Sequence, residues 1–155
     1  MGAAMETPAN SSREPLTSER FPMLLFFDGE CAFCDRWVAR IKEADHARRI
    51  RYGTKQGLTF QQVRLAHPET AYVESVVLLA RRPGGTEEIL VRSRAVRRLL
   101  AGLPGFGFFR LMLAIFPAPL SDVGYRIFSK LRLRLFGKLT HCRVPTEQDR
   151  ELYVE

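Results

Sequence analysis

Cysteine is scarce in this sequence, and long apolar runs are absent from it. Three cysteines in 155 residues are too few, and too odd in number, for a disulfide scaffold. No run approaches the roughly 18 apolar residues that span a bilayer, and the first residues lack the apolar core of a secretory signal. We therefore expect a reducing, cytoplasmic setting, where a close pair of cysteines is more often catalytic or metal-binding than structural.

The composition is that of a folded domain with a polar beginning. Hydrophobic residues make up 46% of the chain, which is enough for an ordinary core. Residues 1–20 are rich in Ser, Thr, Pro, Glu and Ala without periodicity, which predicts a flexible N-terminal tail. We expect a core over residues 21–103 and a helical C-terminal extension, residues 104–155, packed on that core.

Positive charge is concentrated in the second half of the chain. The net charge is +7, and residues 81–138 carry twelve Lys and Arg against three acids. Such a balance fits either a solvated basic face or an anionic partner. No RNA- or DNA-binding motif accompanies the charge, which argues against nucleic acid. The apolar segment 106–116 beside an Arg-rich helix leaves peripheral membrane contact open.

The most informative motif is Asp28-Gly29-Glu30-Cys31-Ala32-Phe33-Cys34, which directly follows the apolar run 23–27. After the motif, apolar residues recur at helical spacing, so both cysteines are expected in the first turn of a helix. Unpaired N–H groups and the helix dipole there favour a thiolate, the form that attacks disulfides. The spacing therefore predicts a dithiol that cycles with a disulfide, the alternative being two buried, inert thiols.

The two cysteines are expected to have different roles. Cys31 lies nearer the helix N-terminus, where we expect the greatest access and the strongest dipole, so it is the candidate nucleophile. Cys34, one turn deeper, is the candidate resolving thiol. The carboxylate of Asp28 either accepts a proton during exchange or caps the turn, and its spacing does not separate these roles.

A metal site is the other chemistry that the cysteines suggest. Cys142 follows His141, and with the motif the two residues make a nominal zinc set. Adjacent His and Cys side chains rarely converge on one metal, and no second Cys-x-x-Cys is present. We therefore expect neither a metal nor a bound cofactor.

Strand and helix signals alternate along the expected core. Apolar runs predict strands at residues 23–27, 50–52, 75–79 and 88–91, the last two as an antiparallel hairpin around Pro83-Gly84-Gly85. Helical spacing predicts helices at 31–45, 58–66 and 93–100, with Ser93 as the N-cap of the third. This order predicts an α/β, thioredoxin-like fold, a mixed sheet with flanking helices. Two apolar segments, 106–116 and 120–136, form the expected helical extension.

The motif resembles that of the DCC family of thiol-disulfide oxidoreductases, named for the Asp, Cys and Cys of D-G-x-C-x-x-C. The likeness covers about residues 23–155 and extends to five further segments, at 74–78, 93–96, 125–126, 135–138 and 142–145. The resemblance implies a thioredoxin-like fold and disulfide oxidoreductase activity. One departure is that ordinary thioredoxins carry a cis-proline before the third strand, where this chain has Tyr72-Val73-Glu74-Ser75.

Three functions remain as hypotheses. The first is a protein-disulfide oxidoreductase that exchanges electrons through Cys31 and Cys34 with a disulfide- or dithiol-containing protein or a small thiol. The second is a non-enzymatic thioredoxin-like binding module whose basic helical face docks on a membrane protein or an anionic surface. The third is a zinc-stabilised domain.

Overall fold

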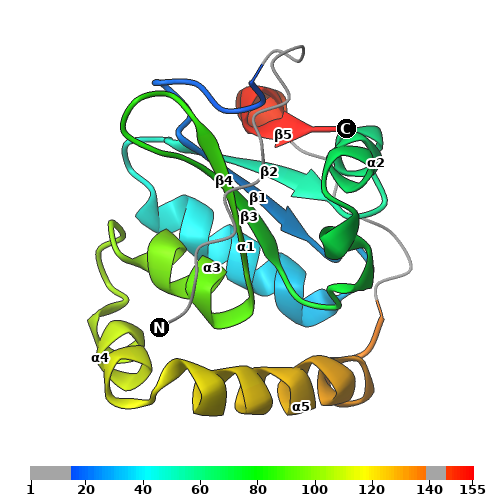
Figure 1. Cartoon of the computed structure of the whole chain (residues 1–155), viewed down its shortest axis with the longest axis vertical. Helices are drawn as coiled ribbons and strands as arrows, with labels where there is room; N and C mark the ends of the chain where they lie inside the picture. Colours follow the sequence, from blue (N-terminus) through cyan, green and yellow to red (C-terminus); the bar gives the residue numbers. More distant parts are fainter. Residues whose placement is uncertain (1–14, 139–145) are drawn as a thin grey trace.

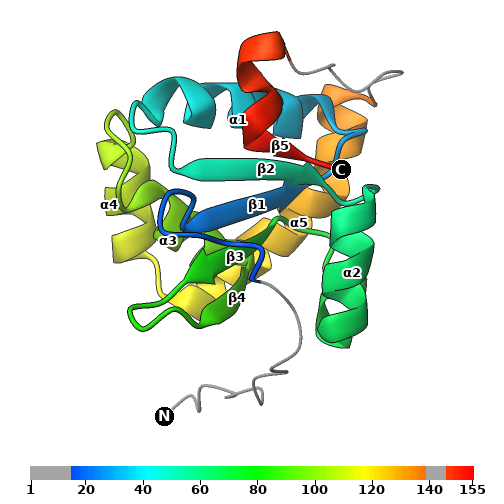
Figure 2. The same ribbon diagram turned by 90° about the horizontal axis from the view of Figure 1, so that it is seen from above.

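A mixed five-stranded sheet forms the centre of the protein, in the strand order β4-β3-β1-β2-β5 that Figure 2 shows. The computed structural model describes residues 15–138 and 146–155. β1 (Met23–Phe27) pairs in parallel with β2 (Ile50–Thr54) and antiparallel with β3 (Val77–Arg81). β4 (Glu87–Val91) pairs antiparallel with β3. The expected thioredoxin-like α/β sheet is confirmed.

Helices cover both faces of the sheet because the side chains of each strand alternate in direction. Leu25 and Phe27 of β1 pack in one core with α1 (Ala32–Ala44) and α3 (Arg92–Leu100). Leu24 and Phe26 pack in a second core with α2 (Leu58–Ala66). A short 3₁₀ helix, η1 (Pro68–Tyr72), then leads into β3. β3 begins two residues later than its apolar run predicts.

Two further helices form an outer layer beyond α1 and α3, on the side away from the sheet (Figure 1). They are α4 (Gly107–Ile115) and α5 (Ala118–Phe136). The predicted N-cap of α3 is wrong: Val91 is the N-cap, and Ser93 lies inside the first turn. The hydroxyl of Ser93 instead donates to Asp122 Oδ1 of α5 at 2.6 Å, which ties the outer layer to the core.

The C-terminal residues correct the expectation of an extension that is helical throughout. After η2 (Glu147–Leu152), residues Tyr153–Val154 form β5, which pairs in parallel with β2 at the sheet edge. A two-residue strand is too short to give a periodic signal in sequence. Leu152 is buried, and the ring of Tyr153 packs on Tyr52 at 5.7 Å.

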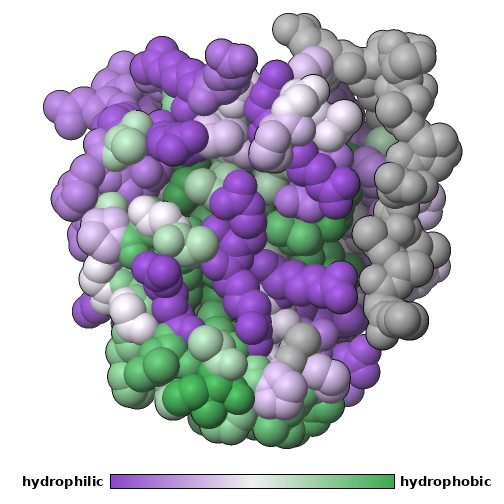
Figure 3. All heavy atoms as spheres, turned by 60° about the vertical axis from the view of Figure 1, so that its left-hand side comes forward, coloured by the Kyte–Doolittle hydropathy of each residue, from purple (hydrophilic) through white to green (hydrophobic). Residues whose placement is uncertain are grey.

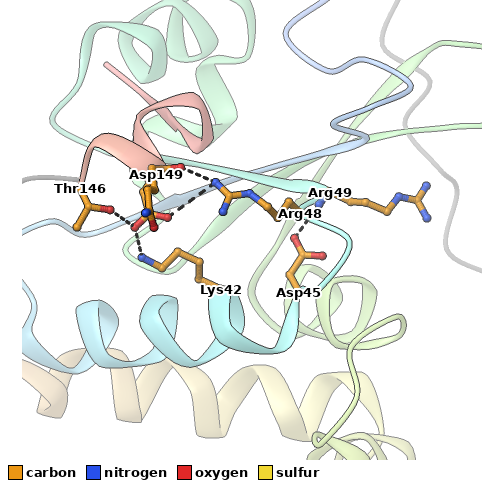
Figure 4. Close-up of polar contacts among 7 residues, drawn as sticks. Lys42, Asp45, Arg48, Arg49, Thr146 and Asp149 are labelled. Carbon is orange, nitrogen blue, oxygen red and sulfur yellow. Dashed lines mark hydrogen bonds and ion pairs between the residues drawn. The ribbon is translucent and has the colours of Figure 1, made fainter.

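An ion pair holds this last segment against α1 (Figure 4). Asp149 accepts hydrogen bonds from Lys42 Nζ at 2.7 Å and from Thr146 Oγ1 at 2.8 Å. The bond from Lys42, followed by the one from Thr146, holds the pKa of Asp149 below its ordinary value. Polar contacts thus join the end of the chain to the core.

The last residues of the expected N-terminal tail, by contrast, contact the core. Residues 1–14 lie outside the described residues, but Leu16 packs on the second core and Thr17 is buried. The backbone N–H and the hydroxyl of Thr17 both donate to Glu87 Oε1, at 2.6 and 2.7 Å. These contacts fix the chain against β4 before β1 begins.

Candidate active site

The cysteine motif lies where β1 ends and α1 begins. Cys31 is the N-cap of α1, with φ −96° and ψ 112°, and Cys34 is in the first turn. The backbone N–H of Cys34 donates to Cys31 Sγ at 3.3 Å. The sulfur of Cys31 therefore takes the place of the usual capping oxygen, where a donor and the helix dipole stabilise negative charge. The expected position of the pair at a helix start is confirmed.

The turn before Cys31 is held by Asp28 and Gln56. Asp28 Oδ1 accepts from the backbone N–H of Glu30 and from Gln56 Nε2, each at 3.1 Å. Gln56 Oε1 in turn accepts from the N–H of Gly29 at 3.2 Å. The carboxylate thus braces the turn that presents Cys31. Gln56 follows β2 far from the motif in sequence, and no pattern pointed to it.

Access to the cysteines differs from the expectation. Cys31 is fully buried, and Cys34 is 5% exposed, so the outer position in the helix does not give Cys31 the greater access. The cover comes from the end of α5, where Lys138 forms an isolated antiparallel bridge with Cys31. Gly137 has φ +77°, a conformation that glycine adopts at little cost and that turns the chain toward the motif.

Aromatic side chains of α1 contact those of the outer layer. Phe33, inside the motif, contacts Phe128 and Phe136 of α5 with ring centroids 4.8 and 4.9 Å apart. One turn further along α1, Trp37 contacts Phe109 of α4 edge to face at 5.1 Å. The cover over the motif is therefore packed as well as hydrogen-bonded.

Cys34 lies in the wall of an apolar cavity of about 670 Å³. Side chains from β1, α1, α3, α4 and α5 line the cavity, together with Val76 just before β3, and nearly all are apolar. A cavity of this volume is large enough for a small organic molecule or an apolar side chain of a larger substrate. The second thiol of the motif thus faces an apolar space.

The loop before β3, where thioredoxins carry their proline, is held by a lysine. Lys55 Nζ donates to the carbonyl oxygens of Val73 and of Ser75, the latter at 2.9 Å. Ser75 is buried, and its neighbour Val76 lines the cavity that Cys34 also lines. The loop is therefore fixed by a side chain from the end of β2 and reaches the same cavity.

The zinc hypothesis involves residues outside those described, because His141 and Cys142 both lie in the segment 139–145. Within residues 15–138 and 146–155, no three His, Cys, Asp or Glu side chains gather to hold a metal ion. Cys31 and Cys34 are not joined by a disulfide in this structure.

A family model described as DCC1-like thiol-disulfide oxidoreductase matches residues 25–138. The chain belongs to this family. The resemblance drawn from the sequence is therefore confirmed, although the match ends at Lys138 and does not reach the segment 142–145. No curated protein and no solved structure matches the chain.

The family match covers the two outer helices of this DCC1-like chain as well as the cysteine motif. The matched residues run from β1 through the motif to Lys138, the residue that bridges to Cys31. The matched region thus includes the outer layer of α4 and α5. A glycine after the last apolar residue of a helix is a common signal of a helix end, but Gly137 gives no sign in sequence of the contact with the motif.

Proposed function

We propose that this chain is a thiol–disulfide oxidoreductase whose Cys31 and Cys34 cycle between a dithiol and a disulfide. The observation that carries the proposal is the hydrogen bond from the Cys34 N–H to Cys31 Sγ at the start of α1. This bond places a backbone donor on the Cys31 sulfur and brings the two residues together across one helical turn. The substrate class is a disulfide- or dithiol-containing protein or a small thiol.

The reaction proceeds in two exchanges. Once the Lys138 bridge that covers it opens, the Cys31 thiolate attacks one sulfur of a substrate disulfide R–S–S–R′. The substrate bond breaks, and R′–S⁻ leaves and takes a proton from water. The thiolate of Cys34 then attacks the Cys31 sulfur of the mixed disulfide, and R–S⁻ leaves in the same way. Two electrons pass from the cysteine pair to the substrate. With an oxidised pair and a dithiol substrate, the same steps run in reverse.

Asp28 acts as a positioning residue in this proposal. Its carboxylate accepts from Glu30 and Gln56, which keeps the turn in the form that places Cys31 at the N-cap. Asp28→Asn keeps an oxygen acceptor and should leave the pH profile of exchange unchanged. Asp28→Ala should slow exchange at every pH. If Asp28→Asn instead removes one limb of the pH profile, the carboxylate transfers a proton and the positioning role is wrong.

Variants of the three cysteines test the proposal with one matched control. Cys34→Ala should accumulate a mixed disulfide on Cys31 with a small disulfide such as hydroxyethyl disulfide, detected by mass spectrometry. Cys31→Ala should form none, and Cys142→Ser should exchange as the unmodified chain does. A mixed disulfide on Cys34 in Cys31→Ala, with none in Cys34→Ala, would reverse the roles.

Thiol counting tests the pair itself. After mild oxidation of the full chain, two of the three thiols should be lost, and mass spectrometry should locate the bond between Cys31 and Cys34. Loss of all three thiols, or of none, would contradict a redox pair formed by these residues.

A further inference from the structure

The outer layer carries an unusual concentration of exposed apolar side chains. Of the fourteen large apolar side chains that are exposed in the described part of the chain, eleven lie between Phe108 and Phe136. Figure 3 shows apolar side chains gathered at the lower end of the molecule, over α4 and α5. Soluble proteins rarely expose so many apolar side chains together unless these side chains bind a partner.

On α5 these side chains form one stripe, and basic side chains run beside it. Residues spaced three or four apart share one helix face, and five exposed apolar residues follow that spacing: Leu120, Val123, Ile127, Leu131 and Leu135. Exposed Arg126, Lys130 and Arg134 each precede one of them by a single position, so the cations flank the stripe. We call the stripe, together with Phe108, Leu111 and Ile115 of α4, the α4–α5 face.

The α4–α5 face has almost no negative charge to balance its cations. Residues 104–138 hold six Lys and Arg but a single acid, Asp122. The carboxylate of Asp122 accepts from Ser93 of α3, on the opposite side of α5 from the stripe. A surface that is apolar in the middle and cationic along its flank complements an anionic bilayer, whose headgroups attract the cations while apolar side chains enter the interface.

No single described helix is long and apolar enough to cross a membrane. The segments Gly107–Ile115 and Pro119–Leu131 reach the required length and apolar content only when they are taken together, and a bend of 119° separates them. The bend joins the exposed residues of the two helices into an elbow. Five of these side chains also line the cavity that contains Cys34: Phe109, Phe116, Leu120, Val123 and Ile127. These five side chains thus belong both to the exposed apolar surface and to the lining of the cavity.

We propose that the α4–α5 face docks this protein on an anionic lipid bilayer, with α4 and α5 lying in the plane of the interface. The positive charge of the α4–α5 face favours an anionic bilayer, rather than a second copy of the chain, as its partner. In a symmetric dimer the face would meet its own image, and its cations would oppose like charges. The docking does not depend on thiol exchange, and the two are measured separately.

Sedimentation with vesicles tests the proposal. The full chain should sediment with phosphatidylcholine vesicles that contain phosphatidylglycerol, and much less with pure phosphatidylcholine or at high ionic strength. Removing three flanking charges, in R126Q/K130Q/R134Q, should weaken binding to the anionic vesicles about a hundredfold. R36Q/R40Q/R64Q removes equally many exposed charges elsewhere and should weaken binding far less.

A second pair of variants tests the apolar part of the face. I127S/L131S should weaken binding about a hundredfold, because two side chains no longer leave water. L58S/L65S changes two exposed leucines of α2 and should bind as the unmodified chain does. Circular dichroism of each variant separates a lost surface from a lost fold, and C31A/C34A should bind unchanged.

Three outcomes would overturn the proposal. The first is no binding to anionic vesicles, and the second is equal binding to vesicles with and without phosphatidylglycerol. The third is a dimer in sedimentation velocity that I127S/L131S dissociates without any vesicle binding, which would assign the face to a second copy. None of these outcomes bears on the cysteine pair, which thiol counting tests by itself.

Discussion

Helices α3 and α4 have the same length and opposite relations to the core. α3 holds four arginines in nine residues, yet it buries Ser93, Ala95, Leu99 and Leu100. In α4 the only charged or polar side chain is that of Arg110, yet none of its nine residues is fully buried. The difference lies in arrangement, because the apolar residues of α3 share one face while those of α4 surround the helix.

This contrast shows that apolar content does not by itself place a helix in the core. The contacts that hold α4 and α5 on their inner side include the Ser93–Asp122 hydrogen bond, the bond from Arg97 to the Phe116 carbonyl oxygen, and the aromatic pairs with Phe33 and Trp37. Within the described residues, none of the exposed apolar side chains of α4 and α5 belongs to either core. These exposed side chains are therefore free to meet a partner.

The largest effect expected from this contrast is on stability. Leu99 is 3% exposed, and Leu99→Ala should lower the free energy of unfolding by about 2–5 kcal/mol, because it leaves a cavity in the core. Leu111 of α4 is 57% exposed, and Leu111→Ala should change the free energy by less than about 0.5 kcal/mol. Urea unfolding measures both. Equal losses would mean that α4 belongs to the core and that the contrast is wrong.

A smaller effect is expected at the link between α3 and α5. Ser93 is buried, and Ser93→Ala leaves the carboxylate of Asp122 without its hydroxyl donor, which should cost about 1–3 kcal/mol. Ser121→Ala, one residue from Asp122, removes only an exposed bond of 3.3 Å and serves as the control. Similar results for the two variants would show that this link does not anchor α5.

The sequence predicted the sheet and the position of the motif well, because these follow from local patterns. The run at β1, the Gly turn and the helical spacing after Cys34 place both cysteines at a helix start. The cover over Cys31 was not predicted, because Lys138 is more than a hundred residues away and no local pattern encodes that pairing. The short strand β5 was missed because its pairing depends on Leu152 and Tyr153 meeting the rest of the core.

Gly137 offers a test of how the outer layer meets the motif. Its φ of +77° is unfavourable for any residue with a side chain, so Gly137→Ala introduces backbone strain of about 1–2 kcal/mol. The substitution introduces no clash, because an added Cβ would meet no atom within 4 Å. We expect the Lys138 bridge to loosen and alkylation of Cys31 by iodoacetamide to accelerate by up to about tenfold. Gly124→Ala, without positive φ or close contacts, should leave the rate unchanged. Equal rates in the two variants would show that Gly137 does not set the cover.

The smallest effect is expected at the ion pair between Asp149 of η2 and Lys42 of α1. The pKa of Asp149 is lowered in the folded protein, chiefly by the hydrogen bond from Lys42. The carboxylate therefore stabilises the fold above its unfolded pKa of about 3.9, and this contribution disappears as the pH falls through the lower folded pKa. Because the pair is partly exposed, Asp149→Asn should cost less than about 1 kcal/mol at neutral pH and nothing once the pH lies below both values. Urea midpoints of Asp149→Asn, the unmodified chain and the exposed control Glu147→Gln, measured from neutral to acidic pH, decide the point. A loss in Asp149→Asn that stays constant across that range would mean that hydrogen-bond geometry, and not charge, holds the end of the chain.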